Sequence, residues 1–155
     1  MNKILQAAIE QARQTMNQGI GGPFGAAVIA ENGNILAVSS NSVLKDKDPT
    51  AHAEINAIRA ACRQRGSYDL SGCVLYTTAY PCPMCLAAII WANIKKVYFG
   101  CRPCDAEAIG FRDDYIYRFI EGKCTDKSVM EITELDRDEC LQLFDEYRQK
   151  KKTIY

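Results

Sequence analysis

Residues 73–101, "CVLYTTAYPCPMCLAAIIWANIKKVYFGC", carry the pattern strand, helix, strand within one short stretch. The run at 73–78 is rich in β-branched and aromatic residues, "PMCLAAIIWA" is typical of a helix, and "KKVYFGC" is typical of a second strand. Strands that alternate with helices predict a sheet with helices packed on both of its faces. This stretch therefore predicts an α/β fold.

The flanking sequence extends the same pattern. Residues 3–17 and 52–65 place apolar side chains at helical spacing, and Gly66 is expected to end the second helix. Two apolar runs meet at Asn32-Gly33, a dipeptide that favours a type I′ hairpin because both central residues of that turn need positive φ. The C-terminal part is predicted to contain a strand and a terminal amphipathic helix, at residues 128–133 and 136–151.

Length and composition predict a single domain over residues 1–155, with a core of ordinary size. Hydrophobic residues make up 48% and charged residues 25%, which is typical of a globular protein. Lys and Arg number 19, as do Asp and Glu, so no overall positive field favours nucleic acid as a partner. The N-terminus lacks the apolar core of a signal peptide and no run reaches membrane-spanning length, so we expect a cytoplasmic protein.

Two predicted helix starts carry metal-binding residue types. Cys82 is expected to cap one helix, with Pro83 in its first turn and Cys85 one turn on, where the helix dipole favours the thiolate form that binds zinc. His52, the sole histidine, and Glu54 follow the helix-initiating "DPT" at the start of the other. One histidine and two cysteines are the three ligands of a catalytic zinc site, and Glu54 is suited to proton transfer beside it.

The segments His52-Ala53-Glu54 and Pro81-Cys82-Pro83-Met84-Cys85 form the H-x-E and P-C-x-x-C signature of zinc-dependent nucleobase deaminases. Together with "GIGGPFGAAVI", "GFRDDYIY" and the final "KKTIY", they make the chain resemble the cytidine-deaminase-like superfamily, and most of all its small bacterial guanine deaminases. The resemblance implies a three-layer α/β/α sandwich with a mixed five-stranded sheet. It also implies one zinc ion per subunit.

In the small bacterial guanine deaminases, guanine is hydrolysed at C2 to xanthine and ammonia. The glutamate of their H-x-E motif protonates N3 and then the departing amine. The resemblance implies that Glu54 is the proton shuttle and that His52, Cys82 and Cys85 bind zinc. The residues that it implies for binding the small purine base are Phe24, Asn41, Ala53 through its backbone N–H, Asp113 and Tyr155. It further implies a homodimer with exchanged C-terminal segments, in which Tyr155 of one copy closes the site of the other.

Structural interpretations stand beside these roles. Phe24 could be a core side chain, Asn41 could end a strand, and Asp113 could be an exposed carboxylate at a helix start, where the dipole favours it. The eight cysteines favour buried thiols and a metal site over a disulfide framework, and Cys101 and Cys104 fit either coincidental thiols or a second metal or redox pair.

Three other functions share parts of this pattern, and the first is deamination of another small aminated heterocycle, such as another aminopurine or a triazine. Transfer-RNA adenosine deaminases resemble the chain in both zinc motifs and near the C-terminus, although the neutral charge disfavours them. A non-catalytic zinc module would use His52, Cys82, Cys85 and a fourth cysteine such as Cys104, and it would leave Glu54 without a role.

Overall fold

The computed structural model describes residues 2–155, and the first of its two compact units ends at Tyr117. The centre of this unit is a sheet of four strands in the order β2-β1-β3-β4. Strand β1 pairs antiparallel with β2 and with β3, whereas β3 and β4 are parallel, so the sheet is mixed. The strands are β1 (Gly25–Ile29), β2 (Ile35–Ser40), β3 (Val74–Ala79) and β4 (Lys96–Cys101).

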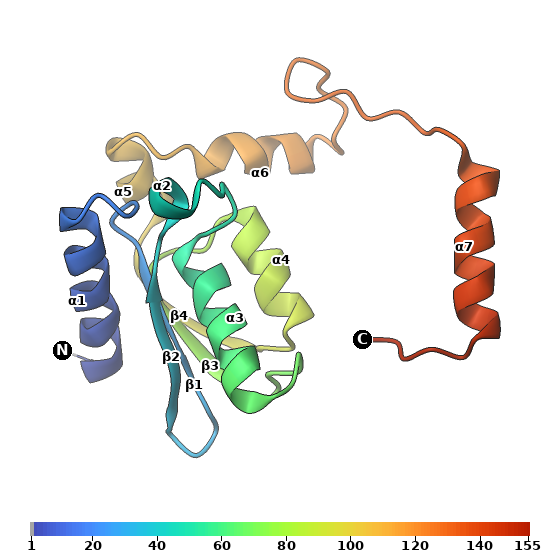
Figure 1. Cartoon of the computed structure of the whole chain (residues 1–155). Coiled ribbons are helices and arrows are strands. Elements are labelled where there is room, and N and C mark those ends of the chain that lie inside the picture. Colours follow the sequence, from blue (N-terminus) through green and yellow to red (C-terminus); the bar gives the residue numbers. More distant parts are fainter. Residues whose placement is uncertain (1) are drawn as a thin grey trace. The chain divides into compact units, whose positions relative to one another are not determined.

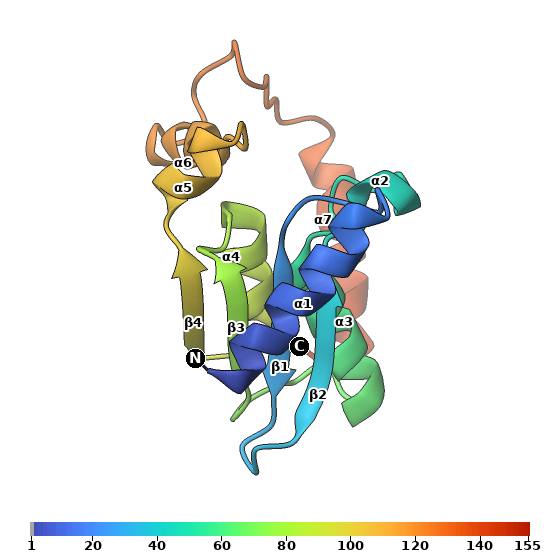
Figure 2. The same ribbon diagram turned by 90° about the vertical axis from the view of Figure 1, so that its left-hand side faces the viewer.

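Helices lie on both faces of this sheet, as the sequence predicted. Helix α1 (Lys3–Asn17) lies on one face, and α3 (Ala53–Arg65) and α4 (Pro83–Trp91) lie on the other (Figure 1). Figure 2 shows the sheet from the side of α1, with β4 at one edge and β2 at the other. The stretch 73–101 forms β3, α4 and β4, and this confirms the α/β prediction.

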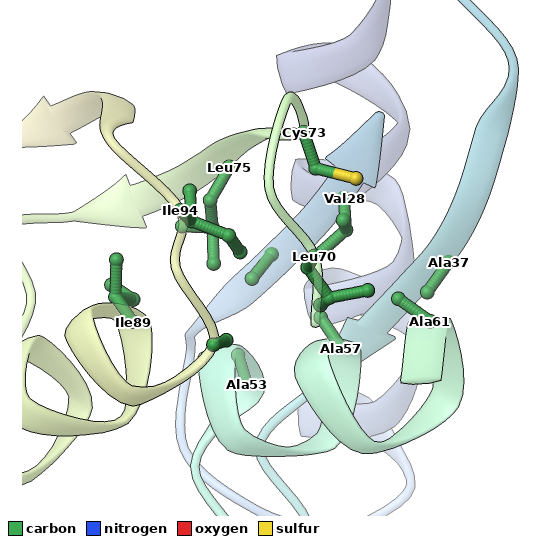
Figure 3. Close-up of a cluster of buried hydrophobic side chains, with 12 residues drawn as sticks. Val28, Ala37, Ala53, Ala57, Ala61, Leu70, Cys73, Leu75, Ile89 and Ile94 are labelled. Atoms are coloured by element: carbon green, nitrogen blue, oxygen red, sulfur yellow. The ribbon is translucent and has the colours of Figure 1, made fainter. Parts of the chain in front are cut away.

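The core between the sheet and α3 is built from small side chains on the helix and larger ones on the strands. Ala53, Ala57 and Ala61 recur at helical spacing and are fully buried, so the helix lies close to the sheet (Figure 3). Leu75 on β3 packs in the same cluster. Because side chains alternate along a strand, Thr77 points to the same face as Leu75, toward the start of α3.

The hairpin was predicted at the right place, but the turn type was wrong. Gly33 has φ +85°, whereas Asn32 is not among the residues with positive φ. The Gly33 N–H donates to the Ala30 carbonyl and the Ala30 N–H donates to the Asn34 carbonyl, which makes a three-residue loop instead of a two-residue type I′ turn. Asn32 accepts a hydrogen bond from the Asn34 N–H at 3.0 Å and so stabilises the longer loop.

The predicted fifth strand is wrong. Residues 128–133 have turn or irregular conformation, and the sheet has four strands among the residues that the structure describes. A strand requires a neighbour for its backbone hydrogen bonds, and Met130 and Ile132 are instead exposed. The remaining elements are the helices α2 (Val43–Asp46), α5 (Pro103–Ala108), α6 (Asp113–Glu121) and α7 (Arg137–Gln149).

Residues 118–155 form the second compact unit. It contains the end of α6 and the helix α7, which confirms the predicted terminal helix. None of the residues of α7 is buried, although the helix carries Leu143 and Phe144. That the whole chain acts as a single domain stays a prediction. Across residues 2–155, no helix has the length and apolar character needed to cross a bilayer.

Candidate metal centre and substrate pocket

The helices α3 and α4 each begin at a predicted metal ligand. His52 is the N-cap residue of α3 and Cys82 is that of α4, and both have extended backbone conformation. Neither side chain caps its own helix, and Pro83 and Cys85 occupy the first turn of α4. The two helices run side by side with their first turns at the same end (Figure 1). The side chains of both caps therefore face each other instead of their own backbones.

The distances within this cluster fit a zinc ion. His52 Nδ1 lies 3.6 Å from Cys82 Sγ and 3.6 Å from Cys85 Sγ. A tetrahedral zinc with bonds of about 2.3 Å to sulfur and about 2.05 Å to nitrogen places these two atom types about 3.6 Å apart. Among residues 2–155 this is the one group of three or more metal-binding side chains. Three ligands leave one coordination position open, which is typical of catalytic zinc.

The two cysteine thiols have opposite pKa shifts, which arise mainly from a hydrogen bond between them. A hydrogen bond with Cys85 lowers the pKa of the Cys82 thiol to about 4, and the same bond raises the pKa of Cys85 above its usual range. The hydrogen bond with Cys82 also raises the pKa of His52. The pair therefore loses its first proton well below the usual pKa of a thiol, whereas its second proton is released at higher pH or when a metal binds.

Glu54 lies on the first turn of α3 and is 6% exposed. Thr77 on β3 donates a hydrogen bond from Oγ1 to Glu54 Oε1 at 3.0 Å, and Cys85 Sγ lies 3.5 Å from Oε2. Burial raises the pKa of this carboxyl above its usual range. A carboxyl with a raised pKa accepts a proton more readily than an ordinary carboxylate, which suits a group that must accept and return one.

A cavity of about 310 Å³ opens onto these residues. His52, Glu54 and Cys82 form part of its lining. Three of the predicted substrate residues line the same cavity, and they come from the segment before β1, the end of β2 and the start of α6: Phe24, Asn41 and Asp113. Burial raises the pKa of Asp113. The structure thus brings together the predicted metal ligands, Glu54 and three of the predicted substrate residues, which are far apart in the sequence.

The other two predicted residues have different positions. Ala53 is fully buried at the first position of α3 and belongs to the hydrophobic core. Tyr155 is an exposed residue of the second unit. Cys101 and Cys104 are both exposed, and neither belongs to a metal-binding group among the described residues. The second metal pair considered for them therefore has no support in the structure.

Asn41 has a fixed side-chain orientation. Its Oδ1 accepts hydrogen bonds from the backbone N–H of Gly22 at 3.1 Å and of Val43 at 3.2 Å. Asn56 on α3 holds the adjoining chain, because its Nδ2 donates to the Ser40 carbonyl at 2.9 Å. The amide of Asn41 therefore presents its Nδ2 donor group to the cavity.

Sequence reasoning missed three residues of the site. Phe111 lines the cavity, and its ring meets that of Phe24 edge to face with centroids 4.8 Å apart. Thr77 holds Glu54, and Tyr117 donates a hydrogen bond from its hydroxyl to the Pro81 carbonyl at 2.9 Å. Burial raises the pKa of Tyr117 to about 12, so that its hydroxyl keeps the proton that it donates. The available signals were a threonine on the buried face of a strand and a tyrosine one turn after Asp113.

Known proteins share this arrangement. Residues 1–101 match the family model of the cytidine and deoxycytidylate deaminase zinc-binding region. A guanine deaminase of Bacillus subtilis (strain 168) is 46% identical over 125 residues, which cover 81% of this chain and 80% of that protein. A tRNA-specific adenosine deaminase of Aquifex aeolicus is 43% identical over 96 residues, which cover 62% of each chain.

A solved structure of a guanine deaminase from the same organism also matches the chain. The X-ray structure of guanine deaminase from Bacillus subtilis matches with a TM-score of 0.92 and 41% identity, over 100% of this chain and 99% of that chain. The family match spans His52, Glu54, Cys82 and Cys85. The chain belongs to the zinc-binding family of cytidine and deoxycytidylate deaminases.

Proposed function

We propose that the chain catalyses the hydrolytic deamination of guanine to xanthine and ammonia. One observation carries this proposal: a three-ligand metal site and the buried Glu54 line the same cavity as Asn41 and Asp113. The relative that matches over most of both chains is a guanine deaminase, whereas the tRNA-specific deaminase matches over a shorter part. The site therefore combines the chemistry of hydrolysis with groups that can read a purine base.

His52, Cys82 and Cys85 would hold zinc, which supplies a Lewis acid that lowers the pKa of water from its bulk value to about 7. Glu54 would take one proton from that water and deliver it to N3 of the base, where it stays in the product. It would then take the proton of the hydroxyl added at C2 and deliver it to the departing amine, which leaves as ammonia. Thr77 holds Oε1 of Glu54, whereas Oε2 lies 3.5 Å from Sγ of the predicted metal ligand Cys85, so Oε2 would be the oxygen that moves the proton. The raised pKa of this carboxyl suits a group that must gain and lose a proton within one cycle.

Selectivity for guanine follows from the polarity of the cavity. Guanine carries hydrogen-bond donors at N1 and at its exocyclic amine, and the carboxylate of Asp113 would accept from them. Adenine has an acceptor at N1 and would leave that carboxylate without a donor, at a cost of about 1–3 kcal/mol. Asn41 would donate from Nδ2 to an acceptor of the base, and Phe24 would pack against the ring. Ala53 would donate its backbone N–H, which has no partner within the first turn of α3.

The first experiment follows ammonia release from the zinc-loaded protein with guanine, adenine, cytosine and a transfer-RNA anticodon stem-loop. Turnover of guanine, with little or none of the other three, is the expected result. Release from the stem-loop alone would replace the proposed substrate with RNA. No release from any base would favour the non-catalytic zinc module, which already lacks its fourth cysteine among the described residues.

We also propose that the chain works as a homodimer with exchanged C-terminal segments, in which Tyr155 of one copy completes the site of the other. Helix α7 leaves Leu143 and Phe144 exposed, and α4 leaves Ile90 and Trp91 exposed, so each unit has apolar surface that a second copy could cover.

Complementation between two defective variants tests this exchange. Neither Glu54→Gln nor a chain lacking Tyr155 should turn over guanine efficiently by itself. In an equal mixture, half of the dimers contain one copy of each variant, and one of their two sites would have both groups intact. Recovery of about a quarter of the wild-type activity is expected on these statistics. No recovery, in a mixture shown by light scattering to be dimeric, would contradict the exchange.

A further inference from the structure

The side chain of Asp113 lines the cavity and has no hydrogen bond to a side chain or backbone group of the described residues. Its carboxylate is therefore not held by partners of its own, and its position depends on the backbone that carries it. That backbone is the first turn of α6, which begins at Asp113. The contacts that hold the first turn of α6 should therefore also determine whether the Asp113 carboxylate can bind a base.

Tyr117 lies four residues after Asp113 on α6, so the two side chains project from the same face of the helix. The Tyr117 hydroxyl donates to the backbone carbonyl of Pro81 at 2.9 Å. Pro81 immediately precedes Cys82, the N-cap residue of α4 and a member of the metal-binding group. On one face of α6, Tyr117 therefore bonds to the residue before the predicted metal ligand Cys82, and Asp113 lines the cavity.

The other side of Asp113 is held by a ring contact. Phe111 precedes α6, and its ring meets that of Phe24 at an interplanar angle of 83° with centroids 4.8 Å apart. Residues 111–117 are thus fixed at Phe111 and at Tyr117, with Asp113 between them. Of these two contacts, only the hydrogen bond of Tyr117 reaches the loop that carries a metal ligand.

We propose that Tyr117 is a positioning residue that strengthens binding of the base in the cavity, because its hydrogen bond to Pro81 places Asp113 relative to the metal site. This inference rests on the proposed function, since it takes Asp113 as the group that reads the base. It assigns to Tyr117 neither contact with the substrate nor a part in proton transfer.

The variant Tyr117→Phe removes the hydroxyl and keeps the ring. We expect KM for guanine to rise about 3- to 10-fold, with kcat nearly unchanged, because Asp113 contacts the base in the ground state and in the transition state alike. Zinc content should stay at one ion per chain. Tyr115→Phe is the matched control, since Tyr115 lies on the same helix and contacts Arg112 through its ring.

A double-mutant cycle separates positioning from general damage. If Tyr117 acts through Asp113, then Tyr117→Phe should have no further effect on KM when it is added to Asp113→Asn. Fully additive effects of the two substitutions would overturn the inference. An equal effect of Tyr115→Phe on KM would do the same.

Amide hydrogen exchange gives a readout that does not depend on the substrate. Residues 111–117 should exchange faster in Tyr117→Phe than in the wild type or in Tyr115→Phe. Unchanged exchange there would overturn the inference even if guanine is the substrate. Faster exchange in a protein whose wild type does not turn over guanine would leave the positioning of Asp113 intact and count against the proposed function alone.

Discussion

The hydroxyl of Thr77 lies 3.0 Å from Glu54 Oε1, so that strand β3 donates a hydrogen bond to the first turn of helix α3. Thr77 is 1% exposed. Water therefore cannot replace this donor if the side chain is changed.

Replacement of Thr77 by valine keeps the shape of the side chain and removes the donor. We expect kcat for guanine to fall about 5- to 20-fold, because the carboxylate loses the bond that fixes one of its oxygens, whereas KM should change little. Thr77→Ser retains a hydroxyl and should recover most of the rate. Steady-state kinetics of the three proteins measure this, and a serine variant as slow as the valine variant would show that packing matters and the donor does not.

Glu54→Gln should abolish turnover without loss of zinc. An amide cannot carry the proton, and general acid–base catalysis of this kind contributes about 10²- to 10⁴-fold to a rate. Zinc per chain is measured by atomic absorption, and the spectrum of the cobalt-substituted protein should indicate two sulfur ligands. An active Glu54→Gln protein, or a spectrum that indicates three sulfurs, would support the structural zinc module instead.

Zinc uptake should release protons, in a number that depends on pH. Near pH 8 the raised pKa of Cys85 keeps a proton on the thiol pair, whereas Cys82 has a pKa of about 4, so at least one proton is expected per zinc. Near pH 6 the raised pKa of His52 adds further release. Since protons and zinc compete for the same atoms, zinc affinity should weaken as pH falls. Calorimetry in buffers of different ionisation enthalpy counts the protons, and zero release at pH 8 would contradict this proton assignment.

Gly21→Ala should impair the pocket more than Gly22→Ala. A Cβ at Gly21 would collide with the backbone carbonyl of Asn41, which cannot move without disturbing the end of β2. A Cβ at Gly22 would approach the rings of Phe24 and Phe111, with the closest contact at 3.1 Å, and side chains can adjust. We expect Gly21→Ala to lower the free energy of unfolding by about 1–3 kcal/mol and to raise KM, both measured beside wild type. Equal effects of the two substitutions would contradict this account.

The local parts of the structure could be predicted from the sequence. Cys82 and Pro83 identify the start of α4 because a proline in the first turn loses no hydrogen bond, and Gly66 ends α3 with φ +68°. His52 could be predicted as a metal ligand once the two cysteines were recognised, because the chain has no other histidine to complete the ligand set. Such signals lie within one turn of a helix and need no knowledge of the tertiary fold.

Contacts across the fold could not be predicted in the same way. The bond from Tyr117 to Pro81 joins residues 36 positions apart, and it depends on where α6 lies after β4. The expected strand at 128–133 failed for a related reason, because apolar alternation shows that a segment could pair but does not supply a neighbouring strand. Asp113 was identified through a family resemblance, whereas the groups that hold it have no such signature.

The backbone N–H groups of Gly22 and Val43 donate to Asn41 Oδ1 and so fix the orientation of its carboxamide at the edge of the cavity. A carboxamide is nearly symmetrical in shape. The amide of an asparagine without such hydrogen bonds can therefore rotate and exchange the positions of its acceptor oxygen and its donor nitrogen. Asn41 cannot do so without breaking its bonds to Gly22 and Val43. If Asn41 contacts the base as proposed, a variant that prefers a different base would therefore need changes in the loops before β1 and after β2, because rotation of this one side chain would break both hydrogen bonds.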